Sequence, residues 1–326
     1  MAFDLNLSQD QRLIVEAAAA LLAESFPLGR LREARQDDLA PLCAFGAFSL
    51  SASEEEGGSG FTIVEEALVH TLLGRHLLTT RSLATTVAAA VARSVGEGAL
   101  ATAIASLGRP VCAGLPGAQG ILVLDPVPNA AVLVFGDRQL SLVETGAVRE
   151  QPGLGHSVAV ALAGGTGSTL ASTDDPARLA AADLLVSCHL LGVAEGARDL
   201  AVAYAAMRRQ FGKPIGAFQA VKHHAADMAI RAEMLSAQRD MAAIALADRR
   251  PDAAFQVAAL RRLAPPVALA NARACIQLHG GIGFSAEADA HHFVKHAHAL
   301  SRLGEAASLL DLPSPMAPRQ PAAERT

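Results

Sequence analysis

The segment from Tyr204 to Gln219 carries the residue types that grip an anionic ligand. Its sequence is Tyr-Ala-Ala-Met-Arg-Arg-Gln-Phe-Gly-Lys-Pro-Ile-Gly-Ala-Phe-Gln, which places Arg208 near a predicted helix end beside a glycine turn. A guanidinium in that position can hold a phosphate through paired hydrogen bonds. From Arg208 to Arg262 the chain has ten Lys or Arg and five Asp or Glu residues, so this stretch is basic although the whole chain carries −5. Solvated arginines on the outside of helices would give the same charge, so charge alone leaves both interpretations open.

A second candidate segment, from Cys275 to Phe284, has the sequence Cys-Ile-Gln-Leu-His-Gly-Gly-Ile-Gly-Phe. Adjacent glycines after a helix let backbone N–H groups approach a ligand oxygen without side-chain obstruction. The amide of Gln277 offers both a donor and an acceptor. A glycine run also ends many helices that bind nothing, so this segment alone predicts only a helix end.

Taken together, the two segments closely resemble the motifs of the acyl-CoA dehydrogenase family. The family pattern Tyr-x-x-x-Arg-x-Gln-Phe-Gly-x-Pro-Ile-x-x-Phe-Gln begins here at Tyr204, and its Ala-Asp-Met follows at 226–228. The later pattern Gln-x-x-Gly-Gly-x-Gly-Phe begins at Gln277. A loop at 55–60, Glu-Glu-Gly-Gly-Ser-Gly, is similar to the family's Pro-Glu-x-x-Gly-Gly-x-Gly loop without its proline. The resemblance is close over residues 174–312 and loose over 1–108.

This resemblance implies a fold, a reaction and a cofactor. Family members have an N-terminal helical domain, a middle β domain and a C-terminal four-helix bundle, and they form dimers or tetramers with FAD at the subunit interface. They dehydrogenate acyl-CoA thioesters between the α and β carbons, which implies an electron-transfer flavoprotein-like acceptor. Their bundle residues reach the pyrophosphate and adenosine of a flavin held mainly by the neighbouring subunit. Carried over position by position, the resemblance assigns FAD contacts to Arg208, Gln210, Phe211, Gln219, Gln277, Gly280 and Gly281.

The sequence departs from the family where the flavin ring is held. The family's middle domain carries a segment like Thr-Glu-Pro-x-Ala-Gly-Ser-Asp, which hydrogen-bonds the ring and frames the acyl group. Residues 163–168, Ala-Gly-Gly-Thr-Gly-Ser, are a poor substitute for this segment and predict a turn instead. We therefore expect this chain to hold the flavin ring badly or not at all.

A second departure concerns the catalytic base. The reaction removes a proton α to the thioester, and a positioned glutamate is the general base. Most members have this glutamate 27 residues after the first Gln of the Gln-x-x-Gly-Gly motif, where this chain has Gly304 followed by Glu305. Other members have it 26 residues before the motif arginine, where this chain has Ala182 followed by Asp183. One residue along a helix rotates a side chain by about 100°, so Glu305 and Asp183 are weak candidates and the base is unknown.

With these two departures, the chain resembles the smaller, base-lacking subunits of heteromeric bacterial dehydrogenases that act on steroid-CoA side chains. They predict that this chain completes the cofactor site of a second acyl-CoA dehydrogenase subunit in a heterotetramer. A self-sufficient homo-oligomer that uses Asp183 or Glu305 is one alternative. A scaffold subunit without flavin is another, but packing alone would not require Arg208, Gln277 and the glycine pair.

The elements that must position these residues follow from hydrophobic periodicity and breakers. The fold is expected to be mainly α with a small β domain: a helical domain at 1–108, a shortened β domain at 109–173, a four-helix bundle at 174–312 and a disordered proline-rich tail at 313–326. The long bundle helices are predicted at 176–210, 217–248, 252–280 and 287–310, with Pro265-Pro266 kinking or breaking the third. Asp175 and Pro176 provide the cap and first residue of the first bundle helix.

Composition excludes several classes of protein. Apolar residues make up 51% of the chain, which rules out a largely disordered protein, and the charge of −5 argues against a nucleic-acid binder. The four cysteines form no Cys-x-x-Cys pair, and His292 and His296 lack an evident third ligand, so we expect no metal. The start of the chain lacks the pattern of a signal peptide. The apolar stretch from Leu179 to Ala194 contains Asp183 and is shorter than a membrane span, so we expect a cytoplasmic protein without membrane contact.

Overall fold

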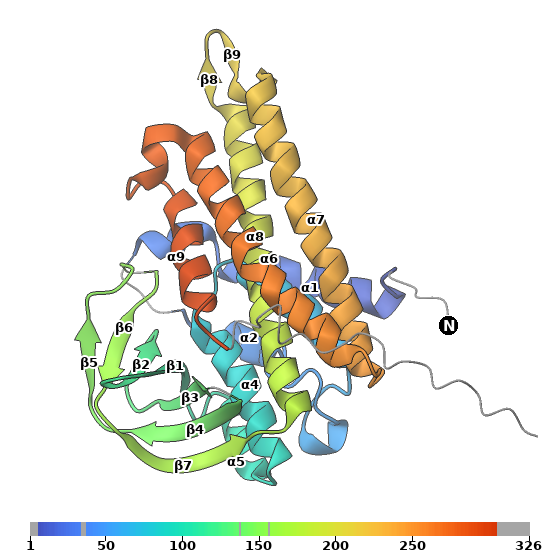
Figure 1. Cartoon of the computed structure of the whole chain (residues 1–326), viewed down its shortest axis with the longest axis vertical. Helices are drawn as coiled ribbons and strands as arrows, with labels where there is room; N and C mark the ends of the chain where they lie inside the picture. Colours follow the sequence, from blue (N-terminus) through green and yellow to red (C-terminus); the bar gives the residue numbers. More distant parts are fainter. Residues whose placement is uncertain (1–5, 34–36, 137, 156, 305–326) are drawn as a thin grey trace, which may run out of the picture.

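The computed structural model describes residues 6–33, 37–136, 138–155 and 157–304. An N-terminal group of helices and a curved sheet lie together at one end of a long helical bundle (Figure 1). This confirms the expected class, mainly α with a small β domain. Glu305 and the tail at 313–326 lie outside the described residues.

The N-terminal part consists of helices of 3–17 residues, and capping boxes begin the helices that start at Gln9, Glu54 and Ile63. Ser8 accepts a hydrogen bond from the N–H of Gln11 at 3.1 Å, and the Gln11 side chain accepts one from the N–H of Ser8 at 3.0 Å. The three consecutive glutamates at 54–56 form a single 3₁₀ turn. The helices are α1 (Gln9–Ser25), η1 (Leu28–Arg32), α2 (Ala40–Ala44), η2 (Glu54–Glu56), α3 (Ile63–Arg75), α4 (Thr80–Ser94) and α5 (Gly98–Ala105).

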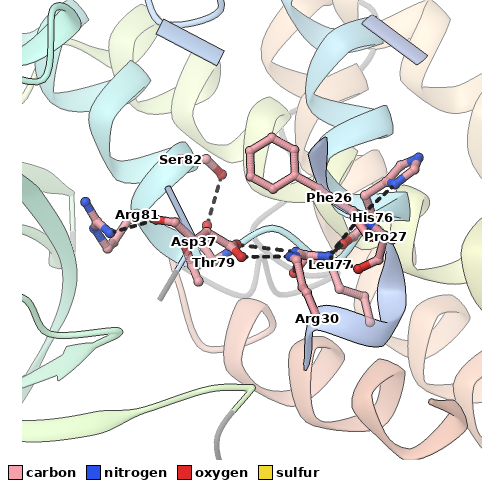
Figure 2. Close-up of polar contacts among 9 residues, drawn as sticks. All are labelled: Phe26, Pro27, Arg30, Asp37, His76, Leu77, Thr79, Arg81 and Ser82. Carbon is pink, nitrogen blue, oxygen red and sulfur yellow. Dashed lines mark hydrogen bonds and ion pairs between the residues drawn. The ribbon is translucent and has the colours of Figure 1, made fainter. Parts of the chain in front are cut away.

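A buried polar cluster around Arg30 joins these helices (Figure 2). The Arg30 guanidinium donates to Asp37 Oδ1 at 2.7 Å and to the carbonyls of His76 and Leu77, each at 3.0 Å. The Asp37 carboxylate also accepts from the N–H of Thr79 at 3.0 Å, and its side chain is only 4% exposed. One arginine thus satisfies open carbonyls at the end of α3 and pairs with Asp37, the carboxylate that accepts from the residue before α4.

The middle of the chain forms one seven-stranded sheet whose order is β5-β6-β2-β1-β3-β4-β7. Only β1 and β3 pair in parallel, and every other neighbouring pair is antiparallel. One face of the sheet packs against α4, and alternate residues such as Val111 and Ala113 join the core shared with the helices. The strands are β1 (Val111–Gly117), β2 (Gly120–Leu124), β3 (Ala131–Gly136), β4 (Gln139–Thr145), β5 (Val148–Gln151), β6 (Val160–Ala163) and β7 (Thr166–Thr173).

Within the described residues, the bundle has three long helices and one short one. As predicted, Asp175 accepts from the N–H of Ala177 at 3.1 Å and Pro176 is the first residue of the first bundle helix. The fourth helix is shorter than predicted, because it begins after Asp289 and ends at Leu300. The bundle elements are α6 (Pro176–Met207), α7 (Gln219–Ala247), α8 (Ala253–His279), η4 (Gly280–Phe284) and α9 (Ala290–Leu300).

Of the predicted kink or break at Pro265 and Pro266, the break is wrong, since α8 is continuous through both. A proline inside a helix lacks the N–H that would bond the carbonyl four residues earlier, at a cost of about 3 kcal/mol. Helix α8 packs along both α6 and α7. The apolar surface buried there offsets the two missing hydrogen bonds.

Helices α3 and α6 cross at very short range because glycines meet at the crossing. A Cβ on Gly192 would lie 2.0 Å from the carbonyl oxygen of Thr71, and one on Gly74 would lie 2.2 Å from that of His189. Neither position has room for any side chain. The N-terminal helices therefore dock against the bundle backbone to backbone.

The expectation that the apolar stretch of α6 is too short for a membrane span is also wrong. At 32 residues, α6 is long and apolar enough to cross a membrane by length and composition. However, 67% of its most apolar 18-residue window is buried inside the protein, as in the core helix of a folded bundle.

Candidate functional site

The first motif forms a tight hairpin at the end of α6. Strands β8 (Arg209–Gln210) and β9 (Lys213–Pro214) are joined by Phe211 and Gly212, whose φ angles are +50° and +81°. These angles match a type I′ turn, the usual two-residue connection of a hairpin. Helix α6 therefore ends at Met207, and its predicted extension to Gln210 is wrong because the chain turns back on itself. The hairpin projects beyond the bundle in Figure 1.

Phe211 stands at the tip of this hairpin with its side chain 90% exposed. A phenylalanine rarely adopts a positive φ, so the tip combines backbone strain with an exposed aromatic ring. The ring meets Phe218 edge-on at 6.1 Å, and Lys213 Nζ lies 4.4 Å from the centre of the Phe218 ring. These contacts hold the hairpin against the start of α7, where Gln219 is also exposed.

A ring stack brings the two motifs together. Tyr204 on α6 and His279 at the end of α8 are stacked with 4.1 Å between ring centres and 21° between planes. His279 Nδ1 donates to the carbonyl of Cys275 at 2.8 Å, because a carbonyl only accepts, and this fixes the ring. Arg208 follows Tyr204 by one helical turn and Gly280 follows His279 directly. Both motifs therefore lie at the same end of the bundle.

The groups at this end are open to a ligand. Gly280 has a φ of +66°, and a Cβ added to Gly280 or Gly281 would meet nothing within 4 Å. Gln210 and Gln277 are exposed. Within the part of the chain that the structure describes, no group hydrogen-bonds the exposed Arg208 guanidinium, whereas Arg209 Nη2 donates to the Gly212 carbonyl at 2.9 Å. An open guanidinium beside unobstructed backbone amides suits an anionic ligand such as a diphosphate.

The two positions from which family members take their base lie in one small cavity. Ala182 and Gly304 both line it, together with Asp183, and its volume is about 80 Å³. The other lining residues come from β3, β4, their connection and the start of α6: Phe135, Gly136, Arg138, Leu140 and Leu179. Among the described residues of this lining, Asp183 is the one carboxylate.

Asp183 is paired with an arginine that the sequence analysis did not identify. Arg261 Nε lies 3.6 Å from Asp183 Oδ1, and the Arg261 side chain is 1% exposed. Its Nη2 donates to the carbonyls of Leu303 and Ser301, the latter at 3.4 Å. Burial lowers the pKa of Arg261 while the Asp183 carboxylate raises it. The sequence contains a signal for the burial of this arginine. Arg261 lies four residues after Val257, which places it on the apolar face of α8.

The turn predicted at 163–168 is confined to its two glycines, because Ala163 ends β6 and residues 166–168 begin β7. Gly164 and Gly165 are the two residues that connect β6 to β7, and both are exposed. A Cβ on either would meet nothing within 4 Å.

The histidines of the core are held neutral by burial. His70 Nδ1 and His189 Nε2 lie 3.0 Å apart where α3 meets α6. Burial lowers the pKa of His189 and His296 to about 3 and that of His292 to about 4, and it lowers the pKa of His70 well below 6.5. Among the described residues, no group of three or more His, Cys, Asp or Glu side chains is placed to hold a metal ion.

Comparison with known proteins places these features in a family context. Residues 177–304 match the family model described as acyl-CoA dehydrogenase, C-terminal domain. Acyl-CoA dehydrogenase IpdE2 of Mycobacterium tuberculosis is 32% identical over 313 residues, which cover 91% of this chain and 93% of IpdE2. Acyl-CoA dehydrogenase FadE34 of the same organism is 33% identical over 281 residues, 80% of this chain, but the match spans only 39% of FadE34.

Solved structures share the fold at lower identity. A chain of the Tcur3481-Tcur3483 steroid ACAD, G363A variant, superimposes with a TM-score of 0.76 at 22% identity, covering 91% of this chain and 94% of the other. A chain of the ChsE4-ChsE5 complex from Mycobacterium tuberculosis gives a TM-score of 0.73 at 22% identity, covering 91% and 95%.

Proposed function

Because the chain belongs to the acyl-CoA dehydrogenase family, we propose that it is the cofactor-completing subunit of a hetero-oligomeric, FAD-dependent enzyme that dehydrogenates an acyl-CoA thioester. One observation carries this proposal. The end of the bundle keeps an open, anion-gripping set of groups, while the described lining of the cavity at Ala182 and Gly304 contains one carboxylate, Asp183, which is paired with Arg261. A subunit of this kind supplies cofactor contacts and leaves the proton abstraction to its partner.

The residues at the end of the bundle have distinct roles in this proposal. Arg208 grips the pyrophosphate through paired hydrogen bonds, and the backbone N–H groups at Gly280 and Gly281 approach the same anion. Phe211 at the hairpin tip packs against the adenosine portion, with Gln277 as a hydrogen-bonding neighbour. When bound, FAD accepts the hydride from the acyl chain, and the protein supplies position and electrostatics.

The partner and the acyl group follow from the same proposal. The partner is a second acyl-CoA dehydrogenase subunit that supplies the base and the groups around the flavin ring. The ChsE4-ChsE5 structure contains two different chains, and the Tcur3481-Tcur3483 enzyme is described as a steroid ACAD. A steroid-derived acyl-CoA is therefore the substrate that we propose, with an electron-transfer flavoprotein-like protein as the acceptor.

The structure bears on part of each alternative. A self-sufficient homo-oligomer would use Asp183 or Glu305 as its base, and the ion pair with Arg261 stabilises the ionised carboxylate of Asp183, which argues against Asp183 as the proton acceptor. Glu305, the other candidate, lies outside the described residues. A flavin-free scaffold would have no use for the exposed, strained Phe211 or the open Arg208.

The experiment that tests the proposal is a visible spectrum of the full chain, purified alone and co-purified with its candidate partner subunit. We expect little or no FAD in the chain alone, because the shortened sheet lacks the ring-binding segment, and a flavin spectrum in the complex. Stoichiometric flavin in the chain alone would contradict the heteromer.

We expect Arg208→Ala to weaken FAD retention in the complex by roughly ten- to a hundredfold. A charge-assisted hydrogen bond contributes about 1.5–3 kcal/mol, which corresponds to that range. Arg208→Lys should recover only part of the loss, because an ammonium cannot make the bidentate contact. Retention is measured as the flavin released during equilibrium dialysis.

Arg209→Ala is the matched control, because Arg209 already donates to the Gly212 carbonyl within its own hairpin. Thermal stability of the flavin-free chain should hardly change in either variant. Equal flavin release from the two variants, or no release from Arg208→Ala, would show that the assignment of Arg208 is wrong.

A further inference from the structure

A side chain limits the space in the cavity at the start of α6. Asp183 lines the cavity beside Gly304, which has a φ of +76°. A Cβ added to Gly304 would lie 2.5 Å from Asp183 Oδ1 and 3.6 Å from Arg261 Nε. Real Cβ atoms essentially never come within 3.0 Å of another heavy atom. The Asp183 carboxylate therefore occupies the space that any side chain at position 304 would need.

Arg261 fixes this arrangement from inside the bundle. Its guanidinium is fully buried, faces the Asp183 carboxylate and also donates to the carbonyls of Leu303 and Ser301. One cation thus ties the start of α6 to the segment that follows α9. Removing the Asp183 carboxylate would take an ion-pair partner from the buried Arg261 guanidinium, so Arg261 depends on Asp183 for charge compensation.

We propose that Asp183 and Arg261 form a latch that closes this cavity and denies the chain an acyl-binding site of its own. At about 80 Å³, the cavity is far smaller than the ≈ 300–1,000 Å³ of ordinary small-molecule sites. In this proposal the carboxylate of Asp183 fills the cavity, and Arg261 holds that carboxylate in place. The inference rests on the proposed function, which assigns acyl binding and proton abstraction to the partner.

The latch is tested by thiol labelling in the full chain. Ala182 lines the cavity and is 4% exposed, so Ala182→Cys places a probe on its wall. Iodoacetamide labelling of this cysteine, followed by peptide mass spectrometry, should be slow. Adding Asp183→Ala should raise its rate by about tenfold or more, because opening of the cavity exposes the thiol. Asp174→Ala, which removes an exposed carboxylate just before α6, should leave the rate unchanged.

Two natural cysteines serve as internal controls. Cys188 and Cys275 are fully buried, and burial raises the pKa of each thiol to about 12, so they label only when the chain opens widely. Faster labelling at position 182 with both controls unchanged supports the latch. An unchanged rate at position 182 overturns it.

Parallel acceleration of all three cysteines would mean that Asp183→Ala loosens the whole chain. Asp183→Ser, which keeps a polar group at the site, is then tested in the same way. Faster labelling at position 182 alone supports the latch, and parallel acceleration of all three cysteines overturns it. These measurements need neither FAD nor a partner. A failed latch and a failed flavin prediction are therefore separate results.

Discussion

Replacing Arg30 by alanine is expected to lower the free energy of unfolding by about 3–5 kcal/mol, the cost of leaving one member of a buried ion pair alone. The Asp37 side chain is only 4% exposed and would lose its counter-ion. The carbonyls of His76 and Leu77 would lose their donor in the same step. The effect is large because folded proteins are stable by only about 5–15 kcal/mol. The shift in the urea denaturation midpoint measures it.

Arg32 provides the matched control two residues away. It pairs with Asp289 at a similar distance, 2.8 Å, but its side chain is 47% exposed. The Arg32 side chain is half exposed although Asp289 is 12% exposed, so Arg32→Ala should cost less than Arg30→Ala, about 1 kcal/mol. Equal midpoints for the two variants would show that burial of the Arg30 cluster does not govern its contribution.

Acidification from pH 6 to pH 4.5 is expected to destabilise the protein steeply. Unfolding exposes His70, His189, His292 and His296, whose pKa then returns to about 6.5. Burial holds each pKa far lower in the folded state, so the unfolded chain binds up to four protons that the folded chain cannot bind. Stability that these histidines contribute above pH 6.5 is therefore lost as the pH falls.

Two buried carboxyl groups, those of Glu66 and Asp125, counteract this loss of stability on acidification. Burial raises the pKa of Glu66 to about 7 and that of Asp125 to about 6, although Glu66 accepts from Ser51 Oγ and Asp125 accepts from the N–H of Thr80. Their contribution is fully present below the unfolded pKa near 4 and is lost as the pH rises through 6 and 7. In the window from 4.5 to 6 the folded chain thus holds up to two protons on these carboxyls that the unfolded chain lacks.

The net difference is about two protons, which corresponds to roughly 3 kcal/mol of unfolding free energy per pH unit. Urea denaturation midpoints measured at pH 7, 6, 5 and 4.5 should fall accordingly. His292→Phe removes one of the four titrating rings and should lower the slope by about 1.4 kcal/mol per pH unit. A midpoint that stays constant over this range would contradict the neutral, buried histidines.

Elements whose ends depend on one or two residues were predictable from sequence. Asp175 and Pro176 start α6 as expected, because capping and the conformation of proline act within a single helical turn. The continuous α8 was not predictable, because the burial that offsets Pro265 and Pro266 comes from α6 and α7, which are distant in sequence. The end of α6 was misplaced by three residues, because the turn at Phe211 places a bulky residue at a positive φ.

The candidate site likewise combines features that local sequence predicts with features that depend on the tertiary fold. Arg208 and the Gly280-Gly281 pair were found by their motifs, but the Tyr204–His279 stack that brings the motifs together depends on packing between two helices. The sequence motifs identify Arg261 only as one of the basic residues of the bundle. Its place on the apolar face of α8 was visible in the sequence, but its partner Asp183 was not, since the two are joined by the tertiary fold.

The crossing of α3 and α6 at Gly74 and Gly192 has a consequence for how the chain folds. Removing the N-terminal helices would uncover a groove of bare backbone on α6, and the main core runs through all three parts of the chain, from Leu31 to Leu303. The matched segment 177–304 is thus a unit of sequence similarity that depends on the rest of the chain for its core. Helices, sheet and bundle should therefore melt in one cooperative transition, with equal calorimetric and van't Hoff enthalpies.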